Sequence, residues 1–236
     1  MSKIQKAVER IREEGRHTRR GSRASSSPYA TTSLGKGRAE IARMASPDPW
    51  TARELEARGF IDFAGPDRRV ANAFRQMRLG LVQRAAPPNF VVAVTGMVYG
   101  SGTSFVARNL ASSFALDPTK TAVLVDCDLT VGSRPSLATG AANAPGLVDY
   151  LRDENVPVDA ILQPTGIPRM RVILPGTIGQ AGGEPYADPG LYELFMHLKE
   201  RYRDRFVIVD APPLLENADA PMYTRKQQRK AGRMQA

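Results

Sequence analysis

The chain has 236 residues, of which 42% are hydrophobic, so it can bury one sizeable core, and its length favours one domain with appendages. Its single cysteine, Cys127, excludes an internal disulfide framework and a multi-cysteine metal cluster; it fits a reducing compartment and a place in the core. Since no apolar run approaches the roughly 20 residues that cross a bilayer, and the N-terminus has no apolar secretory segment, we expect a soluble, cytosolic protein.

The formal net charge of +9 is concentrated at the two ends of the chain. Residues 1–50 carry a net charge of +6 and residues 223–236 a net charge of +5, which leaves the middle close to −2. Basic ends on a near-neutral middle suggest contact with an anionic surface, either inner-leaflet lipid or nucleic acid. Simple solvated tails are the alternative.

The N-terminal part divides into two predicted segments. In SKIQKAVERIREE the apolar residues recur at i, i+3, i+4 and i+7, which predicts a short amphipathic helix within residues 1–15. The residues that follow are rich in Ser, Arg, Gly and Ala and show no periodicity. We therefore expect a flexible basic linker over residues 16–67.

From residue 68 to residue 222, helices and strands alternate, as in a mostly parallel sheet with helices on both faces. Short, continuously apolar runs predict doubly buried strands at 90–94, 122–125, 171–174 and 206–209. Helical spacing of apolar residues predicts helices over 70–81, 105–114 and 189–203. The strands are followed by acidic or glycine residues, at the sheet edge where open α/β sheets bind ligands.

A glycine-rich loop, GMVYGSGTS, joins the first strand to the next helix. Gly96, Gly100 and Gly102 let backbone amides turn inward, and the helix N-terminus adds its positive end, an arrangement that cradles phosphates. A complete loop of this kind ends in Gly-Lys-Ser/Thr, because the lysine neutralises the outer phosphates and the hydroxyl binds magnesium. Here Thr103 stands at the lysine position, while Ser104 keeps the hydroxyl.

Aspartates end two of the predicted strands. Asp126 and Asp128 follow the second strand, and Asp210 follows the fourth. In this architecture such carboxylates converge on a metal ion and on the attacking group, although caps and turns are the alternative role. His17 and His197 have no second ligand at suitable spacing, so no metal other than magnesium is predicted.

Seven segments between about residues 70 and 215 resemble, in uninterrupted order, the bacterial tyrosine autokinases (BY-kinases) of capsule and exopolysaccharide synthesis, a P-loop family related to MinD and ParA. The segments are NAFRQMR at 72–78, the glycine-rich loop with NLA at 109–111, VLVDCDL at 123–129, RPSL at 134–137, PGLVDYL at 145–151, LPG at 174–176 and VIVDAPP at 207–213. The opening MSKIQKAVERIRE is similar to the N-terminal helix of the exosortase-associated branch of these kinases.

The resemblance implies ATP and magnesium as cofactors. Ser104, Asp126 and Asp210 would then hold magnesium, and Asp126 and Asp128 would be the catalytic carboxylates, with Asp128 as the candidate base.

The resemblance also implies partners. Arg75 and Arg78 would belong to the helix motif that the family uses for self-association. The usual partner is a membrane chain-length regulator, encoded separately in this case. That partner would bring the chain to the inner face of the cytoplasmic membrane.

This sequence departs from the family pattern at positions that the kinases use for their activity. The substituted positions are Thr103 for the loop lysine, Ser101 for an acid, Thr130 for an arginine, and Asn72 for the glutamate of the self-association motif. Tyr223 is alone in the tail, so there is little to autophosphorylate. Losing one charge-assisted contact weakens phosphate binding roughly 10- to 150-fold. Lys120 lies at the wrong end of its strand to replace that contact.

A further departure concerns the sheet. The family continues after the DAPP segment with another apolar strand beside the loop strand, whereas a polar basic tail follows here. We therefore expect the fold to lack its final strand or strands. The loop strand would then be an edge, which proteins normally cover.

Three functional hypotheses remain open from the sequence. The first is a degenerate kinase-like regulator of polysaccharide synthesis and export, with weak or absent ATP binding. The second is an active tyrosine autokinase that uses an unusual cation. The third is a ParA/MinD-like ATPase that binds membrane or DNA. Such ATPases carry two loop lysines and usually Asp-Pro-Gln after the paired aspartates, so the DLT sequence at Asp128 favours the polysaccharide group and makes nucleic acid an unexpected partner.

Overall fold

The structure is a computed structural model. It describes residues 47–66, 68–85, 88–129, 136–140, 143–177, 188–201 and 203–214. All of these belong to one compact unit, Gly37–Ala236. The predicted N-terminal helix, Thr130, Tyr223 and the basic tail lie outside the described residues.

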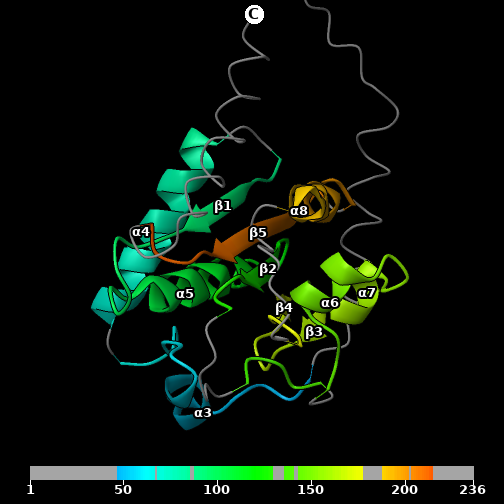
Figure 1. Ribbon diagram of the computed structural model, residues 1–236. Helices are drawn as coiled ribbons and strands as arrows, with labels where there is room; N and C mark the ends of the chain where they lie inside the picture. Colours follow the sequence, from blue (N-terminus) through cyan, green and yellow to red (C-terminus); the bar gives the residue numbers. More distant parts are fainter. Residues whose placement is uncertain are drawn as a thin grey trace, which may run out of the picture. The chain divides into compact units, whose positions relative to one another are not determined.

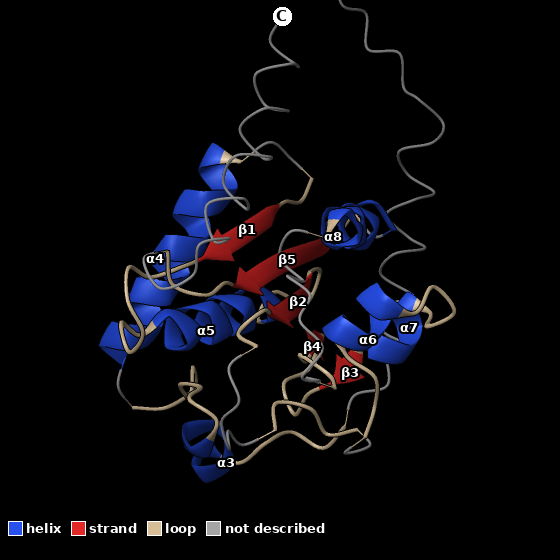
Figure 2. Cartoon of the chain, in the orientation of Figure 1, coloured by secondary structure: helices blue, strands red, loops and turns tan. Residues whose placement is uncertain are grey.

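A five-stranded sheet forms the centre of this unit, in the order β1-β5-β2-β4-β3 (Figures 1 and 2). Its strands are β1 Val91–Val94, β2 Thr121–Asp126, β3 Gln163–Pro164, β4 Met170–Ile173 and β5 Arg205–Asp210. All neighbouring pairs are parallel except β3 with β4. The prediction of a mostly parallel sheet is therefore confirmed.

Helices cover both faces of the sheet, as predicted (Figure 1). The helices on one face are α4 Arg68–Arg84 and α5 Thr103–Ala115. Those on the other face are α6 Leu147–Arg152, α7 Val158–Ile161 and α8 Pro189–Arg201. Because β2 and β5 lie between both layers, all twelve of their residues are buried. This double burial explains why their sequences are continuous apolar runs.

Two predicted core residues lie where the sequence placed them. The Phe206 ring stacks on Phe114 with centroids 4.3 Å apart, and Phe90 packs edge-on against both. Cys127 is a buried thiol directly after β2. Phe206 and Cys127 are therefore confirmed as core residues.

The predicted linker to residue 67 is wrong for its last part. Helix α3, Ala52–Ala57, begins at a capping box between Thr51 and Glu54. On either side of it, Trp50 packs against the core, and Phe60 and Phe63 are buried in it. Because α3 itself buries no residue, it has no apolar periodicity by which the sequence could predict it.

Strand β1 forms one edge of the sheet within the described residues, with β5 as its neighbour. Its four residues are half-buried, in contrast to the fully buried β5. Among the described helices, none is long and apolar enough to cross a membrane.

Candidate phosphate and metal site

The glycine-rich loop runs from the end of β1 into α5 and is fixed by the segment that follows β5. The Thr95 hydroxyl donates to the Pro212 carbonyl at 2.8 Å, and the Leu214 amide donates to the Gly96 carbonyl at 3.0 Å. Gly102 precedes α5 with φ of 85°, a left-handed conformation that favours glycine. No side chain caps α5, so side-chain capping does not occupy its first amides, the groups that bind an anion in a phosphate-binding loop.

Two hydroxyls take the place of the loop lysine. Ser101 Oγ and Thr103 Oγ1 lie 3.1 Å apart, within hydrogen-bond distance. A Cβ on Gly96 would lie 2.0 Å from the Ser101 hydroxyl and 2.5 Å from that of Thr103, so no side chain fits at this glycine. The inner side of the loop therefore presents neutral hydroxyls where a complete loop presents a cation.

The three predicted aspartates come together at the carboxyl ends of two adjacent strands. Asp126 and Asp210 are the last residues of β2 and β5 and are partners in the strand register. The Asp128 amide donates to Asp126 Oδ1 at 3.0 Å, which keeps the turn after β2 beside the sheet. All three side chains are buried, with exposed fractions of 6%, 8% and 2% for Asp126, Asp128 and Asp210.

This crowding changes the protonation of one carboxyl. Burial, and next the Asp126 carboxylate, raise the pKa of Asp210 to about 7, against the effects of a hydrogen bond with Ser104 and the charge of Arg108. Asp210 Oδ2 is buried and accepts no hydrogen bond from the residues that the structure describes. The site therefore holds more buried negative charge than its surroundings neutralise, and Asp210 is partly protonated near neutral pH.

Arg108 is a residue of this site that sequence reasoning missed. It follows Ser104 by four residues on α5, so both lie on one face of the helix. Its Nη1 donates to the Arg58 carbonyl at 3.1 Å, and its charge lowers the pKa of Asp210. The four-residue spacing was the available signal. Lys120, as predicted, precedes β2 at the opposite end from Asp126, with its Nζ 6.0 Å from the Phe206 ring centroid.

The arginines predicted for self-association make contacts within the chain. Arg78 Nη1 donates to the Ser113 carbonyl and so joins α4 to α5. Arg75 donates to Asn72 Oδ1 at 3.0 Å and to the Phe63 carbonyl at 3.2 Å. These contacts give both arginines a role in packing α4.

A magnesium ion would find oxygen ligands here. Within the described residues no group of three or more His, Cys, Asp or Glu side chains is arranged to hold a metal ion. Ser104, Asp126 and Asp210 instead offer one hydroxyl and two carboxylates, the oxygen donors that magnesium prefers. The unpartnered Asp210 Oδ2 fits such an ion, whereas the loop has no cation for the outer phosphates of a nucleotide.

The loop between β1 and α5, the aspartates at the ends of β2 and β5, and the helix-covered parallel sheet define a P-loop-type α/β fold. Solved structures support this class. The kinase domain of Escherichia coli tyrosine kinase ETK is 23% identical, with a TM-score of 0.56 over 78% of this chain and 75% of that one. The chimerical protein CapA2B2 is 17% identical, with a TM-score of 0.55 over 81% and 80%. The BceF tyrosine kinase domain has a TM-score of 0.52 at 22% identity, over 75% and 68%.

The sequence relatives are more specific. "Putative tyrosine-protein kinase EpsB" of Ralstonia solanacearum is 31% identical over 157 residues, which are 65% of this chain and 20% of that protein. Its namesake in Ralstonia nicotianae is 28% identical over 155 residues, with the same shares. The chain is thus homologous to proteins named as tyrosine kinases, of which it spans about a fifth. No protein-family model matches it.

Proposed function

We propose that this protein is a kinase-like regulator of exopolysaccharide or capsule synthesis and export that has lost phosphoryl transfer. The observation that carries the proposal is Thr103, whose hydroxyl lies against Ser101 where a kinase loop presents its lysine. Homology to the EpsB proteins supports the kinase-like ancestry. Without the lysine, ATP is held weakly or not at all, and charge developing on the transferred group is not stabilised.

In this function the chain acts through binding. It engages a membrane chain-length protein at the inner face of the cytoplasmic membrane, and its retained loop and aspartates serve as a scaffold with at most weak affinity for magnesium and ATP. Co-purification of the full chain with such a protein from detergent-solubilised membranes is the expected outcome.

The Thr103→Lys variant tests the lost step. Restoring the cation adds one charge-assisted contact, so ATP affinity in the presence of magnesium is expected to rise roughly 10- to 150-fold by calorimetric titration. Thr103→Met, of similar length to lysine but neutral, is the matched control and should not gain affinity. ATP turnover by the unmodified chain that disappears in Asp210→Ala would overturn the proposal.

One observation favours an active kinase as a second candidate. Ser104 and Asp210 share a hydrogen bond, and the positive charge of Arg108 acts on Asp210. An enzyme that uses this arginine would transfer phosphate without the lysine. For such an enzyme Thr103→Lys brings no gain in affinity, while Arg108→Gln abolishes autophosphorylation.

A further inference from the structure

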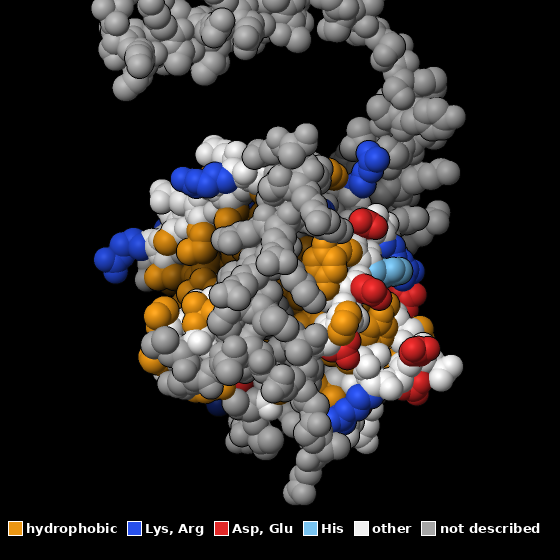
Figure 3. All heavy atoms as spheres, turned by 45° about the horizontal axis from the view of Figure 1, so that its top comes forward, with side chains coloured by type: hydrophobic (Ala, Val, Ile, Leu, Met, Phe, Trp, Pro, Cys, Tyr) orange, Lys and Arg blue, Asp and Glu red, His pale blue; other side chains and the backbone are white. Residues whose placement is uncertain are grey.

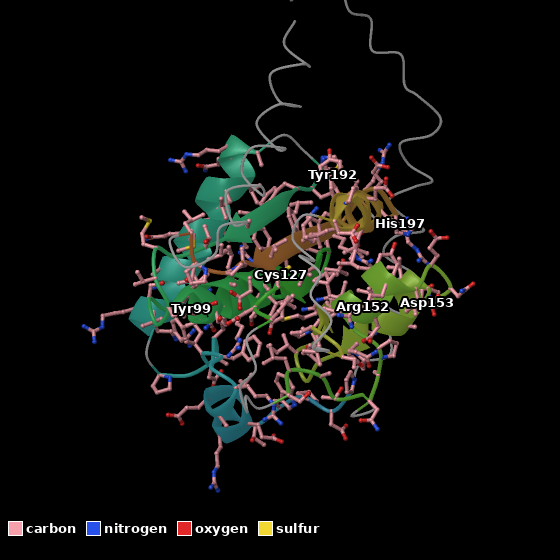
Figure 4. All side chains as sticks on the ribbon, viewed as in Figure 1. Tyr99, Cys127, Arg152, Asp153, Tyr192 and His197 are labelled. Atoms are coloured by element: carbon pink, nitrogen blue, oxygen red, sulfur yellow. The ribbon has the colours of Figure 1, made fainter. Side chains whose placement is uncertain are left out.

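The tip of the glycine-rich loop is apolar and exposed. Met97, Val98 and Tyr99 are consecutive, and their exposed fractions are 56%, 45% and 45%. Figure 4 labels Tyr99 near α5, on the side of the view where α4 lies. Three large apolar side chains in sequence on one exposed turn are unusual for a surface loop and indicate something that covers them.

The same apolar character continues on α4. Val70 and Met77 lie seven residues apart, and so on one helix face, with exposed fractions of 39% and 42%. The Phe74 ring lies 6.0 Å from that of Phe105, which brings the first half of α4 beside the first turn of α5. Phe105 is itself exposed, and the loop runs directly into α5, so the loop tip and this helix face are neighbours.

The segment of the chain that carries these side chains is basic. Residues 68–116 contain six arginines and no Asp or Glu. Arg84 follows Met77 by seven residues and is exposed on the same face of α4. In Figure 3, apolar side chains with Lys and Arg beside them gather on the side of the view where α4 lies, whereas most Asp and Glu side chains gather on the other side.

We propose that this apolar and basic face binds the surface of an anionic lipid bilayer. Its exposed apolar residues are Val70, Met77, Met97, Val98, Tyr99 and Phe105. Apolar side chains that enter the headgroup boundary and arginines that face anionic headgroups stabilise such binding together. The net charge of +9 on the whole chain attracts it to an extended anionic surface from a distance.

The chemistry of the face distinguishes lipid from other anionic partners. Four of its six exposed apolar residues are the aliphatic Val and Met, which offer no flat ring for stacking on nucleic-acid bases. A bilayer accepts aliphatic and aromatic side chains alike, and tyrosine is typical of its interface. The binding uses the outside of the loop and needs no nucleotide, so it is independent of whether ATP binds.

Cosedimentation with vesicles tests the proposal on the full chain. The protein should bind vesicles of phosphatidylcholine and phosphatidylglycerol in equal parts and bind pure phosphatidylcholine weakly. The double variant Met97→Ser, Tyr99→Ser should lose about tenfold in affinity for the anionic vesicles. Leu116→Ser, which removes an exposed apolar residue at the far end of α5, is the matched control and should bind like the unmodified chain.

A pair of arginine variants tests the electrostatic contribution to vesicle binding. Arg84→Gln should weaken binding about fivefold, and Arg53→Gln on α3, with the same loss of charge, should not. All these variants keep both basic ends of the chain, so binding by the ends alone would leave their affinities equal and would overturn the proposal. Unchanged urea midpoints establish that the exposed substitutions leave the fold intact.

A fluorescent label reports insertion directly. The Met97→Cys variant carries a polarity-sensitive dye at the loop tip, because the native Cys127 is buried and does not react. Its emission should shift to the blue with anionic vesicles. No shift would overturn the proposal. Tighter binding to DNA than to vesicles, or loss of self-association in the loop variant without loss of vesicle binding, would assign the face to another partner.

Discussion

The raised pKa of Asp210 predicts how stability depends on pH. An aspartate with a pKa of about 7 in the folded chain and near its ordinary value when unfolded binds more protons in the folded state between these values. The contribution of Asp210 to stability is therefore fully present below its ordinary pKa and is lost as the pH rises through about 7. Asp210→Asn, which mimics the protonated group, should be more stable than the unmodified chain at pH 8 by a few kcal/mol, and about equally stable near pH 4.

Urea unfolding at the two pH values measures this difference. Asp48→Asn, which removes a negative charge at an exposed position, is the control for the loss of charge itself. If Asp210→Asn is the less stable protein at pH 8, the Asp210 carboxylate is ionised and well paired in the fold. Added magnesium should reduce the difference in stability between Asp210→Asn and the unmodified chain at pH 8, because a cation at the site stabilises the ionised carboxylate.

At the scale of elements, hydrogen bonds of Arg108 and of the buried Asn109 attach the segment from Trp50 to Phe63 to α5. Asn109 Oδ1 accepts the Ile61 amide at 2.7 Å, and its Nδ2 donates to the Gly59 carbonyl at 2.9 Å. Asn109→Ala removes both partners and should lower the free energy of unfolding by about 1–3 kcal/mol, because each buried polar group left unsatisfied costs on that order. Chemical denaturation measures this loss.

Limited proteolysis separates a local effect from a global one. In Asn109→Ala the segment should be cleaved faster while the sheet stays protected, since the segment loses both of the hydrogen bonds that Asn109 makes to it. Gln76→Ala, at an exposed position of α4, provides the control. Equal cleavage of the two variants would show that Trp50 and Phe60 hold the segment without Asn109.

The sequence predicts those helices and strands whose own apolar pattern determines their secondary structure. Four strands are apolar runs, of which β2 and β5 are buried along their whole length. The positions of Asp126 and Asp210 follow from the rule that the carboxyl ends of parallel strands share one edge of the sheet. Strand β3 is two residues long, and α6 depends on tertiary contacts: Leu147 and Val148 donate to the carbonyls of Leu174 and Pro175. The Trp50 segment packs against α5 through contacts across the chain, which no local period reveals. Arg108, in contrast, could have been found from its position four residues after Ser104 on α5.

At the scale of the molecule, the two faces of one sheet contribute to two separate hydrophobic cores. Alternate residues of β2 and β5 face opposite layers, so Leu124 and Ile208 belong to the core under α5 while Val125 and Val209 belong to the core under α8. A sheet shared in this way couples the two layers, because neither core can open without exposing the other face of the same strands. The described unit should therefore unfold in one cooperative transition.

One substitution in each layer tests this coupling. Leu110 on α5 and Leu194 on α8 are buried on opposite faces, with exposed fractions of 1% and 0%. Leu110→Ala and Leu194→Ala should each lower the free energy of unfolding by about 2–5 kcal/mol, with little change in the denaturant slope. Leu79→Ala, at an exposed position of α4, should change the free energy of unfolding little.

Urea unfolding followed by far-ultraviolet circular dichroism and by Trp50 fluorescence should give coincident curves for every variant. If Leu194→Ala separates the two curves, the layers unfold independently, and β2 and β5 do not couple them.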